Sequence, residues 1–201
     1  MTFGLTCRAM CAVGTQDTAK TKGVGFTNVK SFVGKRFGTQ AWTDVLSHLS
    51  KQDRAELESA VPVGWYSLSL YARLINEIER VHGTGDLTLV EQLGAYEAEH
   101  DLTTIHRVFL RMANPAFILE QMGNYWKRFH DTGEWEISRL TDKRAVAYLR
   151  GWGHVDPALC RELAGYMRRS FELAGASSVT LEHPRCRARG HADCMFEGCW
   201  R

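Results

Sequence analysis

Apolar positions recur with two different periods along this chain, and the change of period divides it into two parts. Between residues 28 and 129, apolar side chains return at three- and four-residue spacing, which predicts amphipathic helices. After residue 135, apolar and polar residues alternate in short stretches, which predicts strands. We therefore expect a helical first part and a sheet in the second part.

Capping residues, glycines and prolines divide the helical part into separate segments. Gly38 ends one helix, Ser50 caps another, and Asn114 and Pro115 begin a third. These breaks predict one short strand and then a series of helices, over 23–27, 28–37, 39–49, 51–60, 65–81, a segment after Asp86, 102–112 and 115–129. The helix over 65–81 has a wide apolar stripe, which indicates burial on more than one side.

The second part predicts two hairpins with a helix between them, because its strands come in pairs separated by turn residues. The four strands are expected over 135–140, 144–149, 179–183 and 194–200. Asp156 followed by Pro157 is a typical helix start. The order strand-strand-helix-strand-strand after a helical half predicts an α+β fold, in which helices pack on a small antiparallel sheet.

Length and composition indicate one cytoplasmic domain. At 201 residues the chain can bury one core, and no long linker divides it, so we expect a single domain over 23–201 after a flexible leader over 1–22. With 44% hydrophobic residues and a formal net charge of +2, the composition indicates neither disorder nor a nucleic-acid partner. No apolar stretch reaches the length of a membrane span, and the first residues lack the apolar centre of a signal peptide.

Four residues of types that bind soft metal ions lie within the last forty-two residues of the chain: Cys160, His183, Cys186 and Cys194. Cys160 falls in the first turn of its helix, where unpaired amides favour a thiolate. Cys186 and Cys194 flank the loop of the second hairpin, and His183 is expected on the same side of the sheet as Cys194. Three sulfurs and one imidazole are typical of a closed, structural zinc site.

Two other interpretations of these cysteines stay open. Cysteine is among the most buried residue types, so each could be a small hydrophobic residue of the core. A disulfide is the third interpretation, although six cysteines in a cytoplasmic chain favour thiols or metal.

Short motifs carry a resemblance to a known family. They are Gly-Trp-Tyr at 64–66, Gly-Thr-Gly-Asp at 83–86, Phe-His-Asp-Thr-Gly at 129–133, and Cys-Arg-Ala-Arg-Gly at 186–190 with Cys194. Through these motifs the chain resembles a paralogous family of myxobacterial proteins of unknown function. That family in turn resembles the vinyl-four-reductase type ligand-binding domain, which shares its fold with haem nitric-oxide sensors and with the TRAPP trafficking subunits.

The second resemblance implies a zinc site. In the phenol-sensing members, zinc is held by a helix cysteine, a carboxylate and two cysteines of the terminal hairpin. The three cysteine positions match Cys160, Cys186 and Cys194 in spacing, and the carboxylate position falls on His183, beside Glu182.

The resemblance gives less support for the ligands of known relatives. The aromatic positions of the phenol pocket fall on Arg111 and Arg139, so a phenol ligand is not implied. The proximal-histidine context of the haem sensors is not recognisable, so haem is not implied either.

The shared fold implies a cavity between the sheet and the helices, lined by apolar residues. The candidate ligand-binding residues come from both parts of the chain: Ile105, Phe109, Trp126, Trp135, Ile137, Met167, Phe171, Val179 and Leu181. We therefore expect a stand-alone sensor domain that binds an unknown hydrophobic small molecule, has a structural zinc site and catalyses no reaction. A homodimer or a signalling protein is the expected partner, and the candidate dimer contacts are Trp42, Trp65 and Tyr71.

Two alternative functions stay open. An interaction scaffold without a small ligand is suggested by the trafficking subunits, and a fully packed interior would favour it. A metal-dependent phosphohydrolase is a remote alternative, with the candidate ligands His82, His100, Asp101 and Asp131.

Five further basic or titratable residues are interpreted as structural. Arg185, Arg187 and Arg189 are expected at a solvated hairpin tip. His106 and His130 are expected at the surface or at helix ends.

Overall fold

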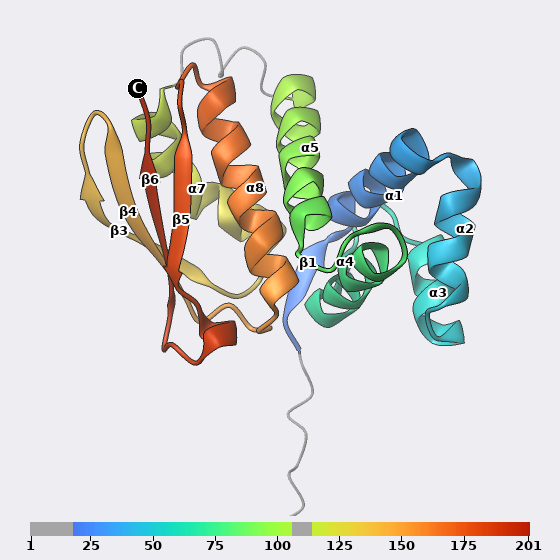
Figure 1. The fold of residues 1–201 in the computed structure, drawn as a ribbon. Coiled ribbons are helices and arrows are strands. Elements are labelled where there is room, and N and C mark those ends of the chain that lie inside the picture. Colours follow the sequence, from blue (N-terminus) through green and yellow to red (C-terminus); the bar gives the residue numbers. More distant parts are fainter. Residues whose placement is uncertain (1–17, 106–113) are drawn as a thin grey trace, which may run out of the picture.

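The computed structural model describes residues 18–105 and 114–201, which form helices and two antiparallel sheets. In Figure 1 the four-stranded sheet lies at one side, α8 and α5 stand next to it, and the shorter helices lie at the other side. The α+β class is confirmed, with helices first and strand-strand-helix-strand-strand at the C-terminal end. Among the described residues, no helix is long and apolar enough to cross a membrane.

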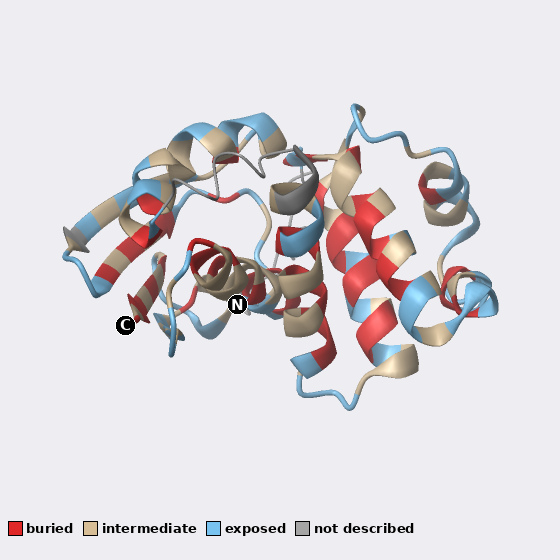
Figure 2. Cartoon of the chain, turned by 90° about the horizontal axis from the view of Figure 1, so that it is seen from above, coloured by how far each residue is buried: buried red, intermediate tan, exposed pale blue. Residues whose placement is uncertain are grey.

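Four helices make up the helical end of the molecule: α1 (Gly23–Phe37), α2 (Thr39–Ser47), α3 (Lys51–Glu58) and α4 (Leu68–His82). α4 lies among the others and buries a wide stripe, in which Leu70, Leu74 and Ile78 are at most 1% exposed. Figure 2 shows the buried residues gathered on the helices in the middle of the molecule. The wide apolar stripe therefore predicts the central position of this helix correctly.

The start of the fold differs from the sequence prediction. Lys20–Lys22, which the composition assigns to a flexible leader, form strand β1, and α1 begins at Gly23, where the pattern predicts a strand over 23–27. β1 pairs with β2 (Trp65–Ser67), so Trp65 and Tyr66 belong to a strand and not to the long helix. Both strands have three residues and exist only through pairing between distant segments. Residues 1–17 lie outside the described residues.

The main sheet is antiparallel and has the strand order β3-β4-β6-β5. Its strands are β3 (Glu134–Leu140), β4 (Arg144–Arg150), β5 (Thr180–Arg185) and β6 (Cys194–Cys199). The register places Trp135 opposite Leu149, and Leu149 opposite Cys194, so these three side chains share one face. α7 (Pro115–Phe129) packs on β3, and α8 (Pro157–Leu173) packs on β5.

Two helix starts follow the sequence prediction in detail. The Asn114 side chain accepts a hydrogen bond of 2.9 Å from the Phe117 amide, and Asp156 accepts one of 2.7 Å from the Ala158 amide. Each cap precedes a proline, which needs no partner for a backbone N–H at that position. Asp156 also accepts a 3.0 Å hydrogen bond from Asn76 of α4, which connects the start of α8 to the helical end.

α5 (Thr88–Ile105) and α8 make the most extensive helix contact in the described part of the chain. A Cβ atom on Gly94 would lie 2.0 Å from the carbonyl oxygen of Glu162, and one on Gly165 would lie 2.0 Å from that of Glu91. The two helices therefore touch backbone to backbone, and their contact joins the helical end to the sheet (Figure 1). The predicted segment 102–112 continues α5 as far as Ile105 and otherwise lies outside the described residues.

Candidate metal centre and candidate ligand site

Four side chains converge beside the first turn of α8, at one end of the main sheet. They are Cys160, His183, Cys186 and Cys194, and one ligand atom from each lies within 4.8 Å of the others. The cysteines are buried, with exposed fractions of 6% for Cys160, 4% for Cys186 and 3% for Cys194. The structure brings together the four residues that the sequence spacing selects.

The sulfur separations suit a tetrahedral metal ion. Cys160 Sγ lies 3.8 Å from Cys194 Sγ and 3.8 Å from Cys186 Sγ. Two zinc–sulfur bonds of about 2.3 Å at a tetrahedral angle place their sulfurs about 3.8 Å apart. A disulfide would need about 2.05 Å, and these three cysteines are free. The separations therefore match a metal shell and not a disulfide.

A β-bulge turns His183 toward the cysteines. The register of β5 on β6 shifts between Glu182 and Arg185, so that His183 and Pro184 together occupy the bulge in an edge strand. The His183 ring stacks on Phe196 at 4.2 Å, and its buried Nε2 has no hydrogen-bond partner. A buried, unpaired imidazole nitrogen beside three sulfurs fits a metal ligand. Glu182 is exposed and does not join the group.

The loop from Cys186 to Cys194 is shaped by backbone hydrogen bonds to the ligands. Residues Arg187–Arg189 form a short 3-10 turn, and Gly190 ends it with φ 88°, a left-handed conformation that favours glycine. The Arg187 amide lies 3.5 Å from Cys194 Sγ and donates to it. The loop therefore fixes both cysteines and also stabilises negative charge on one of them.

The arginines of this hairpin form hydrogen bonds and an ion pair within the loop, while Arg189 is exposed, as expected for a hairpin tip. The Arg187 guanidinium donates to the carbonyl oxygen of Trp152, and the Arg189 guanidinium donates to the carbonyl oxygen of His183. Arg185 forms an ion pair of 3.1 Å with Asp193. Because these three guanidinium groups bind groups of the same chain, the case for an acidic or nucleic-acid partner at this loop is weaker.

The thiols of the cluster differ in acidity. A hydrogen bond from Cys160 lowers the pKa of Cys194 to about 4, with a smaller contribution from His183 and against the opposing effect of burial. The same hydrogen bond, followed by burial, raises the pKa of Cys160. One thiolate is therefore present before a metal binds, and metal binding would displace the remaining thiol protons.

Seven of the nine predicted ligand-binding residues have described side chains, and these belong to two packed clusters. The main core contains Trp126, Trp135 and Met167. A smaller cluster around Trp200 contains Ile137, Phe171 and Val179, while Leu181 packs against both clusters. Phe109 and the side chain of Ile105 lie outside the described residues. The seven described candidates therefore line the expected interface but do not all touch one another.

Trp126 is the centre of an aromatic cluster that contains unpaired nitrogen atoms. Its ring stacks on His130 at 4.0 Å and meets Trp135 and Trp152 edge-on at 5.7 and 5.2 Å. The buried nitrogens Trp135 Nε1, Trp152 Nε1 and His130 Nδ1 have no hydrogen-bond partner. Buried polar atoms without partners are rare in folded proteins, so this cluster is a candidate site for a hydrogen-bonding ligand.

Two members of this cluster make contacts that the sequence does not predict. His130 caps the C-terminal end of α7, as expected, but its half-buried ring packs against Trp126 and Trp152, and burial lowers its pKa to about 3. Trp152 has no place in the predicted site, because it stands between Gly151 and Gly153 outside any periodic segment. A lone aromatic residue in a glycine-flanked loop gives no sequence signal for burial.

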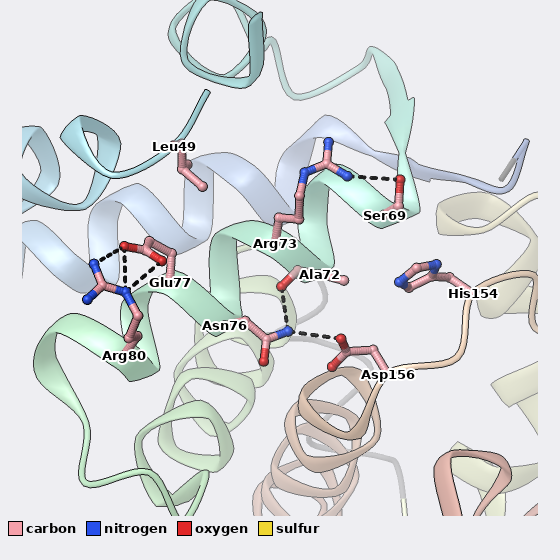
Figure 3. Close-up of a pocket in the computed structure, with 9 residues that line it drawn as sticks. All are labelled: Leu49, Ser69, Ala72, Arg73, Asn76, Glu77, Arg80, His154 and Asp156. Carbon is pink, nitrogen blue, oxygen red and sulfur yellow. Dashed lines mark hydrogen bonds and ion pairs between the residues drawn. The ribbon is translucent and has the colours of Figure 1, made fainter. Parts of the chain in front are cut away.

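A cavity of about 510 Å³ formed by described residues lies elsewhere, between α4 and the loop before α8 (Figure 3). It is lined by Leu49, Ser69, Ala72, Arg73, Asn76, Glu77, Arg80, His154 and Asp156. Arg73 is paired with Asp53, and Arg80 is paired with Glu77. This cavity shares none of the predicted ligand-binding residues.

The candidate metal ligands of the phosphohydrolase alternative do not form a cluster. His82 stacks on Phe37 at 4.4 Å, and Asp131 accepts a hydrogen bond of 2.7 Å from the Lys20 amide. Within the described ranges, three or more potential metal ligands meet only in the cysteine cluster. His82, His100, Asp101 and Asp131 therefore form no metal site.

Comparison with solved structures finds the same fold in H-NOX proteins, whereas no family model and no curated protein matches the chain. The H-NOX protein from S. oneidensis in the Fe(II)NO ligation state has a TM-score of 0.71 at 14% identity, covering 90% of this chain and 99% of that chain. The Fe(II) unliganded H-NOX protein from K. algicida has a TM-score of 0.66 at 16% identity, covering 90% and 96%. The chain therefore shares the H-NOX fold.

Proposed function

We propose that this chain is a ligand-binding sensor domain of the vinyl-four-reductase type, whose cysteine cluster holds a structural zinc ion. The observation that carries the proposal is the convergence of Cys160, His183, Cys186 and Cys194 within 4.8 Å. The H-NOX fold supports a sensor, because those structures are described by the ligation state of their iron. The resemblance to the myxobacterial family and to the zinc-binding sensors is part of the same proposal.

Zinc suits this ligand set better than other common metals. Thiolates and imidazole are soft or borderline ligands, and zinc takes them in tetrahedral geometry. Four protein ligands leave no position for a reactive water, so the ion would stabilise the fold and would not hydrolyse a substrate. Its role would be to hold the start of α8, the edge strand β5 and the terminal hairpin together.

The described residues do not fit a haem group, although the fold is shared with H-NOX proteins. A haem site needs a histidine that faces a large, mostly apolar cavity. His82, His130 and His183 each stack on an aromatic ring, and the cavity beside His154 is lined by four charged side chains, those of Arg73, Glu77, Arg80 and Asp156. We therefore propose a different ligand for this chain.

We propose that the ligand is a hydrophobic small molecule held between the main sheet and the helices α7 and α8. The candidate residues there are Ile105, Phe109, Trp126, Trp135, Ile137, Met167, Phe171, Val179 and Leu181. The described members are apolar, and the aromatic cluster adds two indole N–H donors without partners. Such a combination, apolar walls with a few polar groups, is typical of small-molecule sites.

A thermal-shift screen with hydrophobic compounds tests this proposal. A ligand present at about 100 times its Kd is expected to raise the Tm of the full chain by about 5 °C or more. Ile137→Trp, which fills the inner face of β3, is expected to abolish the shift, whereas Val146→Trp on the opposite face of β4 is expected to keep it. No shift with any compound, or an equal shift in both variants, would count against this location.

One observation favours an interaction scaffold as the second candidate function. Val61, Val63 and Trp65 are 51%, 78% and 41% exposed, and together they form an apolar surface next to β1. Trp65 therefore stays a candidate contact for a homodimer or another protein, whereas Tyr71 is 5% exposed and is excluded as such a contact. Loss of self-association or of partner binding in Trp65→Ser, without any small-molecule effect, would favour the scaffold.

A further inference from the structure

A second buried polar cluster lies at the contact of α4, α5 and α8, and no function discussed above uses it. The Tyr71 hydroxyl lies 3.1 Å from Glu97 Oε1 and 2.5 Å from Glu162 Oε1. Tyr71 is 5% exposed and Glu97 is 4% exposed. A buried carboxyl group of α5 and a half-buried carboxyl group of α8 thus meet one buried hydroxyl group of α4.

Proton counting shows that this cluster holds a proton beyond that of the tyrosine. The Tyr71 hydroxyl has one proton and can donate it to only one carboxyl group at a time. If both carboxyl groups were ionised, two negative charges would lie side by side with little solvent, which is strongly unfavourable. One carboxyl group is therefore protonated and can donate a hydrogen bond to the other.

Glu97 is the carboxyl group that retains this proton. Burial, followed by repulsion from Glu162, raises the pKa of Glu97 well above its ordinary value. Burial raises the pKa of Glu162 as well, but hydrogen bonds from Glu97 and Tyr71 oppose that effect. The opposing hydrogen bonds fit an accepting role for Glu162, which favours Glu97 as the carboxyl group that holds the proton.

The groups around Glu97 add mostly negative charge. Asp101 of α5 raises the pKa of Glu97 further, and the carboxylate of Asp101 accepts a 2.9 Å hydrogen bond from Asn28 of α1. Tyr166 of α8 and Tyr125 of α7 are further titratable groups of the described surroundings, and His100 lies 3.8 Å from Asp101. Among the described residues, several basic side chains of α1 and α8 are paired elsewhere, as shown by the pairs Arg161–Glu91, Arg168–Glu91, Arg169–Glu99 and Lys35–Tyr96.

We propose that Glu97 is a proton-operated latch, which holds α5 against α4 and α8 while it is protonated and loosens that contact when it loses its proton. The backbone contact at Gly94 and Gly165 makes the α5–α8 interface sensitive to small displacements, because it leaves no space for compensation. Since this interface joins the helical end to the sheet, the latch would make the coupling between the two parts depend on pH. The latch requires neither a bound metal nor a bound ligand.

The sign of the effect follows from the raised pKa. Folding raises the pKa of Glu97 above that of an unfolded glutamate, which is about 4.3. Its contribution to stability is therefore present at acidic pH and is lost as the pH rises from about 4.3 through the raised value. The latch is closed at acidic pH and opens as the pH rises through the raised pKa of Glu97.

Thermal unfolding of the full chain between pH 5.5 and pH 8.5 tests the latch. Glu97→Gln keeps the hydrogen-bonding shape of the protonated acid and cannot lose a proton. The Tm of this variant, relative to the parent, is expected to increase by about 3 °C or more across that range. Glu120→Gln, at an exposed position of α7, is expected to follow the parent at every pH. Parallel curves for the parent and Glu97→Gln would overturn the proposal.

A measurement on the parent covers the case in which Glu97→Gln does not fold. Infrared spectroscopy at pH 6 is expected to show the carbonyl band of a buried protonated carboxyl group, and that band is expected to weaken as the pH rises. Hydrogen exchange in α5 and α8, corrected for its intrinsic pH dependence, is expected to accelerate over the same range. Absence of the band at pH 6, or exchange that stays constant, would contradict a protonated Glu97 that closes the contact.

Discussion

Cys186→Ser is expected to lose the zinc ion proposed for the cysteine cluster and to lower the Tm of the protein by about 10 °C or more. Structural zinc contributes apparent binding free energies of about 10–16 kcal/mol in small zinc-binding peptides, so losing one of four ligands removes a large part of the stabilisation. Cys186 Sγ lies 3.8 Å from Cys160 Sγ at the start of the ligand loop, and Cys199, the remaining described cysteine, does not belong to the cluster. Metal analysis and thermal unfolding of protein purified without chelator measure both effects.

Cys199→Ser is the matched control for this experiment. Cys199 is in the same terminal strand as Cys194, but its side chain lies on the other face of the sheet and it does not belong to the cluster. Its substitution is expected to leave the zinc content unchanged and the Tm within about 2 °C of the parent. If both variants behaved alike, or if a chelator left the Tm of the parent unchanged, the cysteines would be buried thiols and not metal ligands.

Gly165→Ala is expected to lower the free energy of unfolding by about 3 kcal/mol or more, which corresponds to a Tm decrease of about 6–12 °C. The added Cβ would lie 2.0 Å from the carbonyl oxygen of Glu91, and backbone atoms of a packed helix cannot move aside as a flexible side chain can. α5 and α8 would have to separate, although their contact joins the two parts of the fold. Urea denaturation followed by circular dichroism measures the change.

Gly123→Ala provides the comparison, because this glycine of α7 has open space where the methyl group would be placed. There the helix propensity of alanine is expected to raise the free energy of unfolding by about 0.5–1 kcal/mol. Opposite signs for the two variants would establish that close packing, and not helix propensity, governs Gly165. A stabilising Gly165→Ala would contradict the backbone contact.

Much of this fold can be predicted from local sequence signals. Asn114 and Asp156 are helix caps followed by proline, and both caps make the expected hydrogen bonds. The alternating strands from residue 134 to residue 150 pair as a hairpin, as do the strands of the terminal hairpin. These signals are local, because a cap or an alternation depends on residues close together in the chain.

The structure differs from the sequence prediction where a residue's conformation or burial depends on segments distant in the chain. Trp65 and Tyr66 continue the apolar pattern of the helix that follows them, and only the partner segment at Lys20–Lys22 draws them into a strand. The burial of Glu97 is likewise not predicted by the sequence, because a glutamate within a helix is normally expected on the solvent side. Its burial depends on Tyr71 and Glu162, which come from other helices.

The candidate metal site combines features that local sequence signals predict with features that they do not. The spacing of Cys186 and Cys194 around a loop with a glycine predicts their proximity, since a hairpin brings its ends together. His183 reaches them through a bulge at Pro184, which the register of β5 on β6 reveals and an alternation pattern alone does not. Trp152 and Arg187 meet only in the folded chain, so the support for the loop has no sequence signal.

X-ray absorption at the zinc edge, on the parent protein purified without chelator or affinity metal, tests whether the cysteine cluster holds zinc. About one zinc ion per chain is expected, with three sulfur ligands at about 2.3 Å and one nitrogen ligand at about 2.0–2.1 Å. Protein that contains no zinc, or zinc surrounded only by nitrogen and oxygen atoms, would contradict it.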